Sequence, residues 1–183
     1  MSQQFLSIKE LCFISVFVAM IIGVSLLPPI PLLGGVPITL QTFIIPLAGA
    51  VLGAKKGGLA ALVYVLIGAI GLPVFSGFTG GIGRIFGVTG GFILSFPLMA
   101  FVIGAGADKN NKIWLALALV AGYFINLFVG MVQFAFVAGV GLQQAFMIAV
   151  APFIVIEVAK MIVVFIVSLS VRKILTKSGL SVI

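Results

Sequence analysis

The charged residues of this chain fall into four short clusters separated by long apolar stretches. The clusters are Lys9 with Glu10, Lys55 with Lys56, Asp108 with Lys109 and Lys112, and Arg172 with Lys173 and Lys177. Only 7% of the 183 residues are charged and 63% are apolar, whereas a soluble domain carries about 25% charged residues to cover its surface. The pattern therefore predicts an all-α integral membrane protein.

The apolar stretches have room for six transmembrane helices, because about 20 residues rising ~1.5 Å each cross the hydrocarbon layer. We expect helices at 8–27, 39–54, 57–72, 91–107, 113–139 and 143–174. The second and third are short for a span, and the pair of lysines between them is the main reason for separating them. At this length we expect one transmembrane domain, residues 1–183.

The basic residues also predict an orientation. Eight of the ten fall on one side of the membrane if the N-terminus is cytoplasmic, so the positive-inside rule favours an N-in/C-in protein of the plasma membrane. We interpret the net charge of +7 as a basic face toward anionic lipid headgroups and not as a nucleic-acid-binding surface. The first apolar run is longer than the hydrophobic region of a signal peptide, and we expect it to be retained.

Several kinds of chemistry are excluded by residue type. The chain has no His and a single Cys, Cys12, so we expect no internal disulfide, no zinc or haem site and no cofactor. It has no P-loop motif for nucleotide phosphates. Energy for uphill transport would therefore come from an ion gradient or from another subunit. No nucleophile–base or metal constellation is present, so an enzyme is not expected.

Glu157 and Lys160 lie inside the last apolar stretch, in PFIVIEVAKMIVV. A charged side chain within a membrane helix costs about 2.5–3.5 kcal/mol, and the i, i+3 spacing puts both groups on one helix face. Three interpretations remain open: an ion pair that fixes the helix to its neighbours, a ligand-binding pair that faces a cavity, and a proton relay. The lack of further acidic residues in other helices weighs against the relay.

The fifth predicted helix carries a polar or small stripe, because Tyr123, Asn126, Gly130 and Gln133 recur every three or four residues. Such a stripe faces protein or water, and it can either hold helices together by hydrogen bonds or line a polar pocket.

Two further polar residues stand out. Arg84 lies in the glycine-rich connection SGFTGGIGRIFGVTGGF. It can either bind a carboxylate with its planar bidentate donors or extend to the membrane surface. Gln41 follows the Pro-rich segment LPPIPLLGGVPI, which we interpret as a lid, a re-entrant plug or a plain connector.

Four stretches resemble, in order and over nearly the whole chain, the motifs of the BioY family. They are VPITLQTFIIPLAGAVLGAKKG, GAIGLPVFSGFTGG, GVTGGFILSFP and PFIVIEVAK. The resemblance implies a biotin-binding S component of an energy-coupling factor (ECF) transporter that takes up the vitamin from outside. A transmembrane coupling subunit and two ATP-binding subunits would be its partners. The family docks on the coupling subunit through small residues of the first helix, which here correspond to Ser15, Ala19 and Gly23.

The chain departs from the family pattern at two motifs. The usual D-x-x-K is Glu157-x-x-Lys160, and the usual G-P-T-G-G-Y is GVTGGF at 87–92. In biotin terms, Glu157 would accept from the ureido N–H groups and Lys160 would donate to the ureido carbonyl. Gln41 and Asn126 would complete the polar shell, with Tyr123 beside them. On chemical grounds alone, Arg84 would pair with the biotin carboxylate.

Two other functions are weighed against this one. An ion-coupled secondary transporter of a small anionic metabolite would show inverted repeats and discontinuous helices in both halves, and no self-similar halves are visible. In a ligand-free structural membrane subunit, Glu157 and Lys160 would act only as a contact between helices.

Overall fold

The computed structural model describes residues 7–31 and 35–180, and the regular structure of this part of the chain is helical apart from two isolated β-bridges. The helices in chain order are α1 (Ile8–Ser25), α2 (Gln41–Leu52), α3 (Ala54–Ala69), α4 (Ile82–Ile85), α5 (Gly90–Asp108), α6 (Lys112–Ala138), α7 (Leu142–Ala149), the 3-10 turn η1 (Ala151–Phe153) and α8 (Ile154–Lys177). An all-α fold is thus confirmed.

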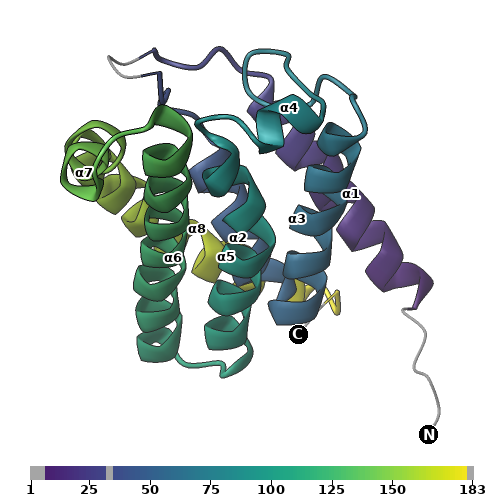
Figure 1. Ribbon diagram of the computed structural model, residues 1–183. Helices are drawn as coiled ribbons and strands as arrows, with labels where there is room; N and C mark the ends of the chain where they lie inside the picture. Colours follow the sequence, from purple (N-terminus) through teal and green to yellow (C-terminus); the bar gives the residue numbers. More distant parts are fainter. Residues whose placement is uncertain (1–6, 32–34, 181–183) are drawn as a thin grey trace, which may run out of the picture.

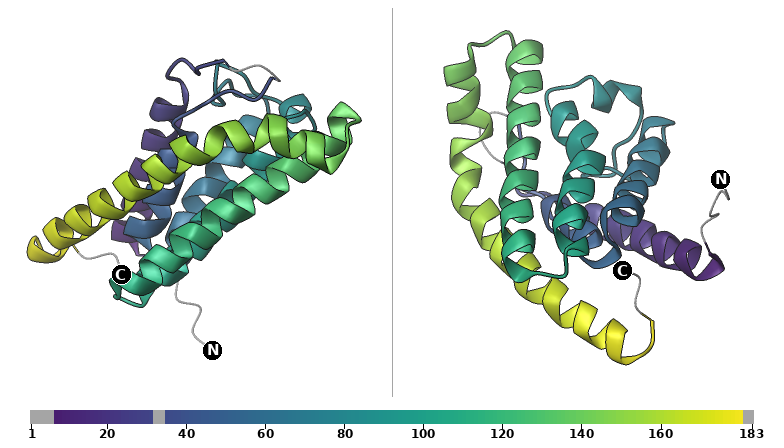
Figure 2. Two further views of the ribbon diagram at one scale, coloured as in Figure 1. Left: turned by 90° about the vertical axis from the view of Figure 1, so that its left-hand side faces the viewer. Right: turned by 90° about the horizontal axis from the view of Figure 1, so that it is seen from below.

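Helix α5 lies in the middle of the bundle and packs against α2, α3 and α6 (Figure 1). Helix α1 lies against α2 and α3 on one flank, and α8 crosses α2 and α6 obliquely on the other (Figure 2). We call the end of the bundle with α4 and α7 the loop end. The opposite end, with the α5–α6 turn and the last turns of α8, we call the charged end (Figure 1).

The charged end brings the four charge clusters together. Lys56 forms an ion pair with Glu10 at 3.2 Å, and Lys9 donates to the Gly179 carbonyl at 3.3 Å. Arg172 donates to the Ala107 carbonyl at 2.9 Å. The four clusters therefore lie at one end of the bundle, as the prediction that they share one side of the membrane requires.

Four stretches of the described chain are long and apolar enough to cross a membrane. They are Ile8–Ser25, Gly90–Asp108, Lys112–Ala138 and Leu142–Lys177. Helix α2 is apolar but has only 12 residues. The structure thus gives four spanning candidates where the sequence predicts six.

The sequence predicted a break between the second and third helices at the lysine pair. In the structure the break between α2 and α3 falls earlier, at Gly53. Gly53 has φ +84°, which an L side chain rarely adopts, and its N–H donates to the Gly49 carbonyl at 2.9 Å. Helix α3 then begins at Ala54, whose N–H donates to Asp108 at 3.1 Å. Lys55 and Lys56 consequently lie in the first turn of α3.

The prediction of one unbroken helix at 143–174 is wrong. Helix α7 ends at Ala149, and Pro152 lies in the 3-10 turn that leads to α8. Proline has no N–H to donate within a helix and clashes with the preceding turn. The interruption sets the direction in which α8 enters the bundle, one turn before Glu157. The short helix α4 was not predicted either.

Candidate binding site

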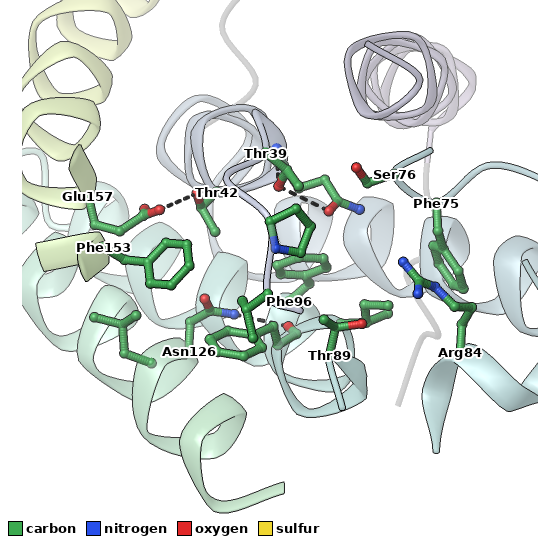
Figure 3. A pocket seen from close by; sticks show the side chains of 16 residues that line it. Thr39, Thr42, Phe75, Ser76, Arg84, Thr89, Phe96, Asn126, Phe153 and Glu157 are labelled. Carbon is green, nitrogen blue, oxygen red and sulfur yellow. Dashed lines mark hydrogen bonds between the residues drawn. The ribbon is translucent and has the colours of Figure 1, made fainter. Parts of the chain in front are cut away.

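A cavity at the loop end is lined from six parts of the chain: the segment before α2, α2 itself, the α3–α4 connection with α4, α5, α6, and the η1–α8 junction (Figure 3). Four phenylalanines form part of its walls and come from three of these parts: Phe75, Phe92, Phe96 and Phe153. Polar side chains from four different helices also line the cavity: Gln41, Arg84, Asn126 and Glu157. This combination of apolar walls and a few oriented polar groups is typical of small-molecule sites.

One end of the cavity is built on the contact between α2 and α8. Lys160 donates to Oε1 of Glu157 at 2.8 Å, to Oγ1 of Thr42 at 2.9 Å and to the Thr39 carbonyl at 2.8 Å. Thr42 in turn donates its hydroxyl proton to the same Oε1 at 2.9 Å. All three donors of the ammonium group are therefore engaged.

The second oxygen of Glu157, Oε2, is buried and has no hydrogen-bond partner among the described residues. The Glu157 side chain is 8% exposed and faces the cavity. An unmatched carboxylate oxygen in a desolvated site costs free energy, so this atom indicates a place where a ligand donates a hydrogen bond.

Asn126 and Tyr123 on α6 contact the site in different ways. Asn126 donates to Oγ of Ser95 at 2.8 Å and to the Phe92 carbonyl at 3.0 Å. Its own carbonyl oxygen receives no hydrogen bond from the described chain. Tyr123 does not line the cavity; its hydroxyl donates to the Thr42 carbonyl at 2.6 Å and thereby holds α2 in place.

Gln41 lies at the first turn of α2 and lines the cavity. Its amide donates to the Tyr64 hydroxyl at 2.5 Å, and its carbonyl accepts from Thr39 at 3.1 Å. Tyr64 meets Phe75 edge to face, with ring centroids 5.6 Å apart. Gln41 therefore also supports an aromatic wall of the cavity.

The other end of the cavity carries Arg84 on α4, far from Glu157 in the view of Figure 3. The Nε atom of Arg84 is buried without a partner, as is Oγ of the nearby Ser76, within the described chain. The segment is fixed from behind by Gln133, which donates to the Ile85 carbonyl at 2.7 Å and the Gly87 carbonyl at 3.1 Å. A guanidinium group held in this way is suited to bind an anion.

The structure brings together four of the predicted ligand residues around the cavity: Gln41, Arg84, Asn126 and Glu157. Lys160 and Tyr123 lie behind this lining. Thr39 and Thr42 line the cavity as well. They were not predicted from the sequence, although they lie three residues apart on either side of Gln41. The four phenylalanines were not predicted either, because nothing distinguishes them among 17 in the sequence.

The small residues of α1 lie away from the cavity. Ser15, Ala19 and Gly23 are all exposed, and a Cβ added at Gly23 would meet no atom within 4 Å. The opposite face of α1, with Phe17 and Ile21, is buried in the bundle. The small face is therefore open to a neighbour.

The fold and the cavity define a class of membrane protein. A solved structure, the crystal structure of the S-component for biotin from an ECF-type ABC transporter, matches this chain with a TM-score of 0.83 and 29% identity. The match covers 91% of this chain and 92% of that one. The molecule is thus a multi-pass membrane protein with the fold of an ECF S component.

The family model of BioY matches residues 1–177, and the chain belongs to the BioY family. The probable biotin transporter BioY of Pyrococcus horikoshii is 40% identical over 153 residues, which are 83% of this chain and 89% of that protein. The biotin transporter BioY of Thermotoga maritima is 38% identical over 166 residues, which are 90% of this chain and 96% of that protein. These matches, to proteins named as biotin transporters, confirm the resemblance. The chain is a transport component of the plasma membrane and not an enzyme.

Proposed function

We propose that this chain captures biotin in the loop-end cavity and serves as the S component of an ECF-type transporter. The observation that carries the proposal is the pairing of unsatisfied groups across one cavity: a buried carboxylate oxygen of Glu157 at one end and a buried guanidinium nitrogen of Arg84 at the other. Biotin has matching groups, with two ureido N–H donors at its ring end and a carboxylate on its tail.

In this arrangement Glu157 and Asn126 accept hydrogen bonds from the ureido group, and the four phenyl rings cover the fused rings and the tail. Arg84 pairs with the carboxylate. Gln41 shapes the wall between the two ends. Lys160 fixes Glu157 from behind, and it reaches the ureido carbonyl if it exchanges one of its three hydrogen bonds. An ion pair whose desolvation is otherwise costly thereby becomes a preorganised binding group.

The partners follow from what the sequence lacks. Without a P-loop, ATP hydrolysis falls to two separate ATP-binding subunits, joined to this chain by a transmembrane coupling subunit. The exposed face of Ser15, Ala19 and Gly23 fits a close helix contact of this kind, because small residues let helix backbones approach each other.

The single transmembrane domain crosses the membrane six times, with α2 and α3 added to the four long stretches. Both termini and the charged end are cytoplasmic, and the cavity opens outward. Cysteine-accessibility labelling of Asn110→Cys in a Cys12→Ser background tests the orientation. We expect labelling only from the cytoplasmic side, and strong labelling from outside would contradict it.

Equilibrium binding of labelled biotin to the detergent-purified chain, with no partner subunit present, tests the function. We expect one site per chain that unlabelled biotin empties in competition. A folded chain that binds no biotin would contradict the proposal.

A further inference from the structure

A second cavity lies at the charged end, between the α5–α6 turn and the last turns of α8. Its lining contains four basic residues, Lys112 from α6 and Arg172, Lys173 and Lys177 from α8, and no acidic residue. The biotin proposal does not use this cavity. Figure 2, in the view from below, shows α8 crossing α6 and continuing past the α5–α6 turn.

The basic groups of the cavity differ in how they are held. Arg172 donates to the Ala107 carbonyl at 2.9 Å and to Oδ1 of Asn110 at 3.1 Å, so its guanidinium is fixed at the wall. The three lysines have no hydrogen bond or ion pair within the described chain. The nearby carboxylate of Asp108 accepts from the Ala54 N–H and does not line the cavity.

An apolar groove lies about one helical turn from this cavity along the same pair of helices. On α8, Ile162 and Phe165 line the groove, and Leu169 and Arg172 follow in the cavity at spacings of four and three residues. This spacing places all four on one face of the helix. On α6 the lining passes in the same way from Ala116 in the groove to Lys112 in the cavity. Ile162 is 53% exposed, so the groove is open to the surrounding medium.

We propose that the charged-end cavity and this groove together bind one anionic phospholipid, with its phosphate among the basic side chains and an acyl chain along the α6–α8 groove. The charge complements a phosphodiester, and the apolar continuation complements a hydrocarbon chain of the same molecule. A soluble phosphate would leave the groove empty, and a zwitterionic lipid would leave the excess positive charge unmatched.

Native mass spectrometry of the full chain in mixed micelles measures this binding directly. The probes are dioleoyl phosphatidylglycerol, dioleoyl phosphatidylcholine and sn-glycerol 1-phosphate. We expect one tightly held phosphatidylglycerol per chain and weaker binding of both other probes. Equal binding of phosphatidylcholine, or glycerol phosphate binding as tight as the lipid, would overturn the proposal.

Paired substitutions locate the two parts of the site. Each basic residue at a membrane surface contributes about fivefold in affinity, so Lys173→Gln with Lys177→Gln should weaken phosphatidylglycerol binding about 25-fold. The charge-matched control, Lys55→Gln with Lys109→Gln, lies outside the cavity and should leave binding unchanged. Equal losses in both double variants would indicate only a diffuse surface charge and would sink the proposal.

The groove has its own pair of variants. Ala116→Phe fills the groove and should weaken phosphatidylglycerol, whereas Leu117→Phe on another face of α6 should not. Unchanged lipid binding in Ala116→Phe would contradict the placement of the acyl chain in the groove. A cooperative thermal transition shows for each variant that the chain is folded, whatever its affinity for biotin.

Discussion

Lys160 and Glu157 lie one helical turn apart on α8, and the ammonium group donates to Oε1 of the carboxylate at 2.8 Å while Oε2 remains without a partner in the described chain. The pair is therefore only half matched within the protein. A buried pair of this kind holds its charge in place before a ligand arrives, and the unmatched oxygen gives the ligand a defined position to donate to.

Glu157→Gln should weaken biotin binding at least about tenfold, because a hydrogen bond to a charged group contributes about 1.5–3 kcal/mol and ~1.4 kcal/mol corresponds to one decade. The substitution keeps the shape of the side chain and removes its charge. Titration with labelled biotin measures the loss. Glu10→Gln is the matched control, because Glu10 pairs with Lys56 away from the cavity, and its affinity should not change. Wild-type affinity in folded Glu157→Gln would leave the pair a purely structural contact.

Lys160→Met should cost both affinity and stability, because it leaves Glu157 buried without its counterion, a change that costs about 3–5 kcal/mol for buried pairs. Denaturation in mixed micelles, followed beside biotin titration, separates the two effects. The double variant Glu157→Gln with Lys160→Met should recover much of the stability and none of the binding. Recovery of both would contradict a role in the ligand site.

The sequence predicted which polar residues line the site, but it did not predict the contacts between them. Gln41, Arg84, Asn126 and Glu157 stand out because each is a polar residue in apolar or glycine-rich surroundings, and each lines the cavity. The contact of Thr42 with Glu157 joins residues 115 positions apart. No local pattern encodes it, because threonine is common in membrane helices and its partner is set by the packing of α2 on α8.

Helix boundaries were predicted well where a charge and a change in hydropathy coincide, as at the C-terminal end of α5 with Asp108 and Lys109. They were predicted less well where backbone conformation decides. Gly53 ends α2 through a positive φ. The prediction relied on the adjacent lysines and therefore placed the end of this helix at residue 54, two residues after its observed end at Leu52. Pro152 was overlooked because the hydropathy remains high across it.

Arg84→Gln should weaken biotin about tenfold or more and leave the binding of an uncharged biotin amide nearly unchanged, because only the acid offers a carboxylate to the guanidinium. Competition between labelled biotin and each ligand gives both affinities in one experiment. The amide is the internal control for the fold of the cavity. Equal losses for acid and amide would remove Arg84 from the carboxylate site.

Gln133→Leu should weaken biotin binding about tenfold, although Gln133 does not line the cavity. The substitution removes two hydrogen bonds that hold the α4–α5 segment, and each contributes about 0.5–1.5 kcal/mol. The loss should be smaller for the biotin amide, since the displaced group is Arg84. Gln144→Leu, at an exposed position of α7, controls for the change in polarity. An equal loss for biotin and its amide would mean that Gln133 acts on the whole cavity and does not position Arg84.

Ala19→Trp should abolish biotin uptake by cells that express a coupling module, yet leave biotin binding by the purified chain within about twofold of the parent. The reason is geometric, because Ala19 is exposed on the small face of α1 and the buried face of that helix is unchanged. Leu117→Trp, on the exposed surface of α6, is the control and should preserve uptake. Co-purification with the coupling subunit should fail only for Ala19→Trp. A parallel fall of binding and uptake would show that this face supports the cavity and is not an assembly surface.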